Sequence, residues 1–259
     1  MLPGLFFTKF SLSLQNFFKR GEYTEGQKRN EERGEYMKFR HEWKHEISRA
    51  DMLLLRQRLK AVAKPDVHAK DGKYEIRSLY FDNLSDKALR EKIDGISRRE
   101  KFRIRYYNGD TSLIHLEKKS KIGGLGNKQS TTISKEEAQA IADGNTEWMR
   151  ESTDVLVQEL YIKMTTEGLQ PKTIVDYTRE PFVFAAGNVR VTLDYNIRTG
   201  LSCTDFLNTE CVTIPAGDAP IILEVKWDEF LPDVIRDIVQ LENRRSGAYS
   251  KYAACRIYG

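Results

Sequence analysis

The sequence predicts an α+β protein: a closed antiparallel β-barrel of about eight strands that forms a polar, basic tunnel, with helices packed outside. Several segments alternate apolar and charged residues, so each strand has one apolar and one charged face. The segments between them have amphipathic helical patterns and need an apolar sheet surface to cover. An open sheet with a solvated face would explain each strand singly. Arg and Lys at the strand centres, where Thr, Ser or Gln are commoner on a solvated face, favour a closed lumen.

The composition is that of a globular protein with one sizeable core. The chain has 259 residues, is 40% hydrophobic and 31% charged, and has a formal net charge of +4. That charge is too small to indicate a nucleic-acid binder by itself. No run of about 18 apolar residues is present, so no transmembrane helix is predicted. The cysteines Cys203, Cys211 and Cys255 lack metal-type spacing and favour a reducing, cytoplasmic location.

Residues 1–36 differ from the rest of the chain. Residues 2–18 are apolar and aromatic but lack the basic region and the cleavage site of a signal peptide. An interfacial amphipathic helix is one alternative. Residues 31–34 can be encoded by a purine run that resembles a ribosome-binding site, just before Met37. We therefore expect residues 1–36 to be a disordered or mis-annotated extension and residues 37–259 to form one domain.

The clearest element is a β-hairpin over residues 101–119 with an Asn108-Gly109 turn. Alternation places its polar side chains on one face, and these are Lys101, Arg103, Arg105 and Tyr107 on the first strand with His115, Glu117 and Lys119 on the second. Gathering cations in this way costs Coulomb energy unless an anion or a carboxylate offsets it.

The other elements follow from periodicity and capping signals. Ser48 with Asp51, and Ser134 with Glu137, have the spacing of capping boxes at helix starts. Further helices are predicted over 85–95, 146–168 and 232–241. Strands are predicted over 38–46, 74–82, 128–133, 173–179, 189–194 and 221–227.

The polar strand faces together predict a basic lumen. Its cations are Arg40, Lys44, Arg103, Arg105, Lys119, Arg179, Arg190 and Lys226, and its acids are Glu42, Glu117, Asp194 and Glu224. The cations of such a lumen would repel one another when it is empty, whereas a polyphosphate chain would neutralise them through charge-assisted Arg contacts. Carboxylates beside phosphates suit a bridging divalent cation, Mg²⁺ or Mn²⁺.

Eight motifs resemble the triphosphate tunnel metalloenzyme superfamily, and within it the bacterial form of the VTC (vacuolar transporter chaperone) polyphosphate polymerase domain. They are RHEWKHE (40–46), RSLYFD (77–82), KFRIRYY (101–107), HLEKKSK (115–121), DYTREPF (176–182), VRVTLD (189–194), ILEVKW (222–227) and SKY (250–252). The resemblance implies a metal-dependent transferase that adds the terminal phosphoryl group of a nucleoside triphosphate such as ATP to polyphosphate. Arg40 replaces the first glutamate of the superfamily's Glu-x-Glu-x-Lys motif, which fits the VTC branch better than hydrolytic branches.

The resemblance and the lumen hypothesis together assign the site. The catalytic residues are Arg103, Arg105, Lys119, Arg179, Arg190 and Lys251, and the substrate-binding residues are Lys44, Lys128, Tyr177, Ser250 and Lys226. The metal ligands are Glu224, Glu42 and Glu117, although Glu117 fits equally well as a salt-bridge partner of Arg103 or Arg105.

Other functions stay open at this point. The same site with water as acceptor would be a triphosphatase or polyphosphatase. A non-catalytic polyphosphate receptor would need the cations but not Glu224. A nucleic-acid binder is disfavoured, because the cations are expected to face inward and the net charge is modest. Without a membrane span of its own, the chain leaves room for a separate membrane partner.

Overall fold

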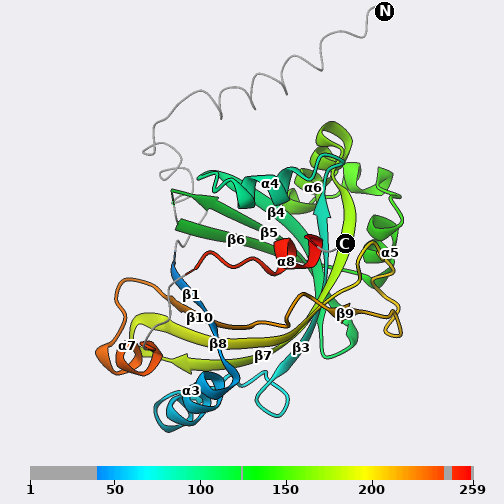
Figure 1. Cartoon of the computed structure of the whole chain (residues 1–259). Helices are drawn as coiled ribbons and strands as arrows, with labels where there is room; N and C mark the ends of the chain where they lie inside the picture. Colours follow the sequence, from blue (N-terminus) through cyan, green and yellow to red (C-terminus); the bar gives the residue numbers. More distant parts are fainter. Residues whose placement is uncertain (1–39, 124, 242–246, 258–259) are drawn as a thin grey trace, which may run out of the picture. The chain divides into compact units, whose positions relative to one another are not determined.

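The computed structural model describes residues 40–123, 125–241 and 247–257 (Figure 1). The N-terminal segment that the sequence analysis sets apart lies outside these residues. Within them, no helix is both long and apolar enough to cross a membrane.

The described chain forms one antiparallel sheet. Its strands follow the order β1-β10-β8-β7-β3-β4-β5-β6, and two short strands, β2 and β9, pair with β7 and β8. The strands are β1 (His41–Ile47), β2 (Lys64–Pro65), β3 (Tyr74–Asp82), β4 (Arg99–Tyr107), β5 (Asp110–Ile122), β6 (Leu125–Ile133), β7 (Gln170–Phe184), β8 (Val189–Thr199), β9 (Ile214–Pro215) and β10 (Ile221–Trp227). The predicted hairpin is confirmed as β4 and β5, and Asn108 and Gly109 both have the positive φ that its two-residue turn requires.

The sheet curls into a half-barrel and stays open, so the predicted closed barrel is wrong. Its two ends are β1 and β6, which share no ladder in the described residues; a single bridge joins Arg40 to Gly126. In Figure 1 one layer contains β1, β10, β8 and β7 and the other contains β4, β5 and β6. Side-chain alternation determines which face each residue occupies, but closure depends on whether two distant edges align, and alternation carries no information about that.

Two of the helices begin at the caps that the sequence predicts. They are α3 (Arg49–Val62), α4 (Lys87–Ile93), α5 (Lys135–Ala142), α6 (Val155–Glu167), α7 (Asp233–Val239) and α8 (Lys251–Arg256), with 3₁₀ turns η1 (Glu147–Glu151) and η2 (Ala186–Asn188). Both capping boxes form, at Ser48 and at Ser134. The helix predicted over 146–168 is interrupted, because Asp154 accepts hydrogen bonds from the amides of Leu156 and Val157 and starts α6 anew.

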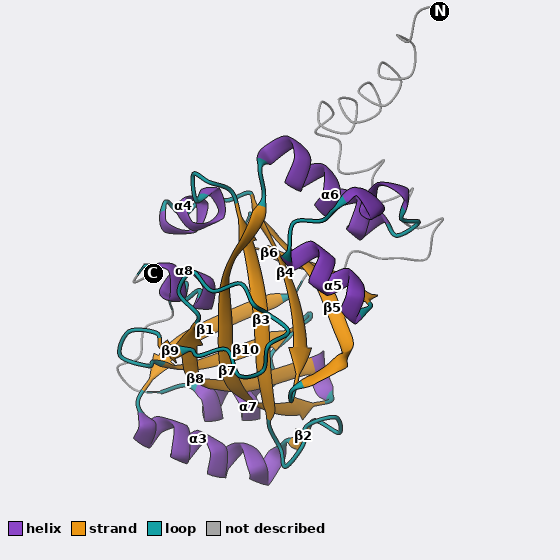
Figure 2. Cartoon of the chain, turned by 90° about the vertical axis from the view of Figure 1, so that its right-hand side faces the viewer, coloured by secondary structure: helices purple, strands orange, loops and turns teal. Residues whose placement is uncertain are grey.

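Most helices cover the convex face of the sheet, as predicted. One apolar cluster packs α5 and α6 against Leu79, Ile104 and Leu116, and another packs α3 and α7 against Leu193 and Val225 (Figure 2). The exception is α8, whose Tyr252 and Cys255 are buried with Tyr80 and Tyr177 in a third cluster, between the two layers of the sheet (Figure 1). The concave face is therefore apolar around α8 and charged elsewhere.

Candidate functional site

The concave face brings together most of the predicted site residues. Alternation along β4, β5, β7, β8 and β10 directs one set of charged side chains inward, while the apolar side chains of the opposite face pack under the outer helices. We call the following described side chains the concave cluster: the cations Lys44, Lys101, Arg103, Arg105, Lys119, Lys128, Arg179, Lys226 and Lys251, and the carboxylates Glu42, Glu117, Asp194 and Glu224.

Glu117 lies at the centre of the first group. Its carboxylate is fully buried and accepts hydrogen bonds from Arg103 at 2.5 and 2.8 Å, and the Lys128 ammonium lies 2.6 Å away. Arg105 Nε is farther, at 3.7 Å. Burial alone would raise the pKa of Glu117, but Arg103, Arg105 and Lys128 together hold it far below its usual range. Glu117 thus stays ionised as the counter-ion of three cations.

Glu224 and Glu42 form the second group, on neighbouring strands β10 and β1. Lys226 bridges the two carboxylates, and Lys44 lies 3.3 Å from Glu42 and 3.6 Å from Glu224. Burial opposes ionisation of Glu224, yet Lys226, Lys44 and Arg179 keep its pKa well below the usual value. The pKa of Lys44 is raised, because the two carboxylates outweigh the effect of its burial. Both glutamates are therefore anionic at neutral pH.

Asp194 organises the third group. It is fully buried, receives two 2.7 Å hydrogen bonds from the guanidinium of Arg179, and pairs with Lys251 at 2.5 Å. Lys251 is placed by Ser250, whose hydroxyl caps α8 by accepting from the amide of Ala253. Burial would raise the pKa of Asp194, but Arg179 and Lys251 lower it to about 2.

Tyr177 connects the first and third groups. Its hydroxyl accepts a 3.1 Å hydrogen bond from Arg105, and the charged ends of Lys251 and Arg179 lie 4.7 and 5.5 Å from its ring centroid. Burial raises the pKa of Tyr177. Arg105, Arg179 and Lys251 lower it by a larger amount, so the net shift is downward. A phenol with a lowered pKa marks a region of positive potential.

Lys119 lies between the first and second groups without a carboxylate of its own. No described residue forms a hydrogen bond or an ion pair with it, and it faces Lys101 across the β4–β5 ladder and Lys128 across the β5–β6 ladder. Burial and the neighbouring Arg103 and Lys226 lower the pKa of Lys119 well below its usual value. Its position is therefore suited to binding an anionic ligand.

Arg190 lies opposite Lys226 across the β8–β10 ladder, but its ion pair is formed with a carboxylate outside the three groups. Its guanidinium contacts Asp66, at 2.5 Å, and its side chain keeps 39% of its surface exposed. Lys128 reaches the cluster through Glu117, although 49% of its side chain stays exposed.

Sequence reasoning missed two features of the site. Lys101 shares the strand face of Arg103 and Arg105, so alternation already placed it inside, but it was given no role. Asp194 was counted among the lumen acids, yet its pairing with Lys251, across 57 positions, leaves no local signal in the sequence.

The carboxylates can be tested as metal ligands by their chemistry. No group of three or more metal-ligating side chains converges within the described residues. Glu42 and Glu224 nevertheless share two lysines and are both ionised. Magnesium commonly takes one or two carboxylates and completes its octahedron with water and substrate phosphates. The pair fits a divalent cation that arrives with a phosphate ligand, and does not form a complete protein cage.

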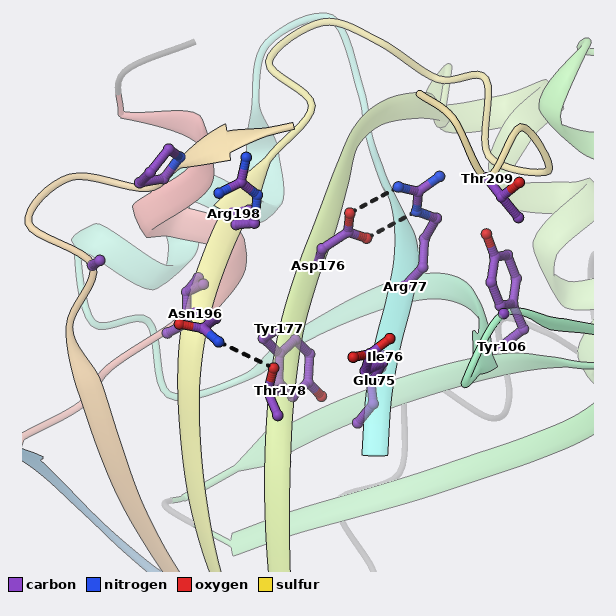
Figure 3. A pocket seen from close by; sticks show the side chains of 14 residues that line it. Glu75, Ile76, Arg77, Tyr106, Asp176, Tyr177, Thr178, Asn196, Arg198 and Thr209 are labelled. Atoms are coloured by element: carbon purple, nitrogen blue, oxygen red, sulfur yellow. Dashed lines mark hydrogen bonds and ion pairs between the residues drawn. The ribbon is translucent and has the colours of Figure 1, made fainter. Parts of the chain in front are cut away.

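A cavity of about 620 Å³ lies beside β3, β7 and β8 and contains only Tyr177 from the predicted site. Figure 3 shows two pairs among its polar groups: Arg77 with Asp176, at 2.9 Å, and Asn196 with Thr178, at 3.4 Å. Arg198 is bound in the same way by the hydroxyl of Thr213, at 3.0 Å. The charged residues that line this cavity are balanced, with Arg77 and Arg198 against Glu75 and Asp176, so we place the chemistry in the concave cluster.

Comparisons with known proteins agree with this geometry. A family model described as the VTC domain matches residues 39–257. HpAC1 from Hippeastrum, described as an adenylyl cyclase candidate with a dominant triphosphatase activity, is 13% identical; the match covers 86% of this chain and 96% of that one, with a TM-score of 0.54. PH1819 from Pyrococcus horikoshii OT3 is also 13% identical, with 83% and 96% covered and a TM-score of 0.44. No curated protein matches the sequence significantly.

Proposed function

The chain belongs to the VTC domain family, and on that premise we propose that it is a metal-dependent polyphosphate polymerase. It would transfer the terminal phosphoryl group of a nucleoside triphosphate to the end of a growing polyphosphate chain. The observation that carries the proposal is the composition of the concave cluster. Its nine basic side chains have only four carboxylates as counter-ions among the described residues. A polyanion with closely spaced charges supplies what is missing.

The two phosphate-binding arginines of β4 have different partners and different tasks. Arg103 is held rigidly by Glu117 and by the hydroxyl of Tyr80, 2.7 Å away, so its position is preset. The buried Nε of Arg105 has no hydrogen-bond partner among the described residues and only a weak 3.7 Å contact to Glu117. Arg105 therefore has a donor to spare for a phosphate oxygen. Arg179 and Lys251, on the other side of Tyr177, would bind the next phosphate along the chain.

Catalysis in this site would depend on position and charge. The transferred phosphoryl group spreads negative charge over its three outer oxygens, and fixed cations stabilise that charge without reorganising. The donor's terminal phosphorus–oxygen bond breaks as the terminal oxygen of polyphosphate bonds to the same phosphorus, and a nucleoside diphosphate leaves. No described pair of a nucleophile and a base is needed, because an ionised phosphate end is itself the nucleophile.

Glu42 and Glu224 would hold the divalent cation. When bound, that cation would draw phosphate oxygens together and neutralise the leaving diphosphate. Lys44 and Lys226, which now neutralise the two glutamates, would then be available to bind phosphate oxygens instead.

Product analysis tests the direction of transfer. Purified protein is incubated with ATP and Mn²⁺, and the products are followed by ³¹P NMR and by gel electrophoresis of polyphosphate. Growth of internal-phosphate signals with release of ADP is expected. Orthophosphate without chain growth would replace the polymerase by the triphosphatase alternative.

The Glu224→Gln variant separates an enzyme from a receptor. We expect turnover to fall by about 10²–10³, the usual effect of removing one electrostatic element of an active site, while polyphosphate binding persists. Glu180→Gln is the matched control, since Glu180 pairs with Arg56 on the convex face. Wild-type protein that binds polyphosphate but never turns over with Mg²⁺ or Mn²⁺ would be a receptor.

A further inference from the structure

Lys101 occupies a position on the concave face that the proposed mechanism leaves unused. It lies two residues before Arg103 on β4, is half-buried, and faces Lys119 across the β4–β5 ladder. Its ammonium nitrogen lies 3.4 Å from the hydroxyl of Ser250, the residue before Lys251, and 5.5 Å from the centroid of the Tyr80 ring. Lys101 therefore links the β4 arginines to the Ser250-Lys251 pair.

The surroundings of this amine are cationic. No described carboxylate lies within ion-pair distance of Lys101, whereas Arg103, Arg179 and Lys251 each have one. The charged groups with the largest effects on it are Lys44, Arg103 and Lys251, which disfavour its charged form, and Glu42, which favours it. Like charges around an amine weaken its charged form, and an adjacent anion restores that form.

We propose that Lys101 is a further phosphate-binding residue of the concave cluster and that its amine takes up a proton when the phosphate chain binds. The proposal rests on the function inferred above and makes phosphate binding by this chain depend on pH. Its chemical basis is that a neutral amine offers a phosphate oxygen only a weak hydrogen bond. The protonated amine offers a charge-assisted one.

The direction of the pH dependence follows from linkage. Burial, with Lys44, Arg103 and Lys251 nearby, lowers the pKa of Lys101 to about 7 in the free protein. Phosphate raises it again, because an adjacent anion favours the charged form. Between these two pKa values, binding must take up a proton, so affinity falls as the pH rises above 7. Tyr177 and Lys119 also have shifted pKa values and can add to the total.

A conservative variant isolates the contribution of Lys101. In Lys101→Arg the side chain is charged at every relevant pH, so it has no proton to take up. Tripolyphosphate binding is measured by calorimetry at pH 8 in two buffers of different ionisation enthalpy. We expect wild type to take up close to one proton more than K101R. The ligand's own protonation is common to both proteins and cancels in the difference.

Two further measurements complete the test. K101R should bind tripolyphosphate more tightly than wild type at pH 8.5, and Lys101→Met should bind at least about tenfold more weakly at pH 7. Lys118→Met is the control, because Lys118 lies on the opposite strand face and pairs with Glu100 at 3.1 Å. Equal proton uptake by wild type and K101R would overturn the proposal. Wild-type protein that does not bind tripolyphosphate would instead overturn the proposed function.

Discussion

The two faces of one sheet use charge in opposite ways. On the convex face, the ion pairs that join the outer helices and strands contain equal numbers of each sign among the described residues, with Arg56, Arg77, Lys87, Lys118 and Lys163 against Glu100, Glu159, Glu167, Asp176 and Glu180. The concave cluster has nine cations and four carboxylates. Strands β4, β5 and β7 contribute to both faces, so the difference arises from alternate residues of the same segments.

The comparison distinguishes charges that stabilise the structure from charges that are available to bind a ligand. Balanced pairs on the convex face hold helices against the sheet and need nothing else. The concave surplus is a cost in the free protein: burial and, after it, the neighbouring cations lower the pKa values of Lys101 and Lys119. A fold keeps such a cost when a ligand removes it. The following changes test whether the two faces differ in this way.

The largest effect is expected from Asp194→Asn. This change leaves Arg179 and Lys251 without their buried counter-ion, and we expect the free energy of unfolding at pH 7 to fall by about 3 kcal/mol. The pKa of Asp194 is about 2 in the folded protein, below its value of 3.8 when unperturbed. Its stabilising effect is therefore complete above about pH 4 and disappears as the pH falls through 2. Urea unfolding at pH 7, 4 and 2 measures it.

Polyphosphate should partly rescue this variant, because an added anion replaces the missing carboxylate. Asp176→Asn on the convex face is the matched control, for which no rescue is expected. A difference between wild type and D194N that stays constant down to pH 2 would contradict the assigned ionisation.

An intermediate effect is expected when Lys119 or Lys118, which are adjacent in sequence but lie on opposite faces of the sheet, is replaced. In wild type, ligand at 100 times its dissociation constant stabilises the fold by about 2.7 kcal/mol. Lys119→Met should leave the free protein as stable or slightly more stable, and should reduce this gain by about 1.4 kcal/mol if binding weakens tenfold.

Lys118→Met should do the reverse. It removes the pairs with Glu100 and Glu159 and costs up to about 1 kcal/mol, as is usual for partly exposed pairs, with the polyphosphate gain unchanged. Thermal melts of both variants with and without polyphosphate provide the comparison. Identical behaviour of the two variants would mean that the faces do not differ in function.

The smallest effect is expected from Arg77→Lys on the convex face. Arg77 donates two hydrogen bonds to Asp176, at 2.9 and 3.0 Å (Figure 3). It also donates to the carbonyl of Asn208. Lysine keeps the charge but cannot form the two parallel hydrogen bonds of the guanidinium, so we expect a loss of about 1 kcal/mol in stability. Hydrogen exchange should report faster opening of residues 201–213. A change in polyphosphate affinity would show that this face, too, takes part in binding.

Local signals in the sequence predicted local structure well. Strands 74–82 and 221–227 have the predicted bounds, and the Ser48 and Ser134 caps form as expected. Each depends on residues within one element, where alternation and capping act directly. The interruption before α6 was missed because the helical pattern on either side of Asp154 continues in phase.

Features that depend on distant parts of the chain were predicted less well. The barrel was expected to close, but closure depends on how β1 and β6 meet after the whole sheet has curled. Alternation placed Arg190 inside with Asp194, yet its partner Asp66 comes from another part of the chain. The roles assigned to the site residues remain predictions; what the structure adds is that most of them lie on one surface.

The position of α8 on the concave face bears on the order in which the chain can be assembled during synthesis. Arg103 and Glu117 are only 14 residues apart and can meet as soon as their hairpin has emerged from the ribosome. Lys101 and Ser250 are separated by 149 residues, and Asp194 and Lys251 by 57 residues. Contacts of such long range close late and slow folding. A nascent chain that ends before α8 therefore has its hairpin but lacks the surface on which the other groups converge.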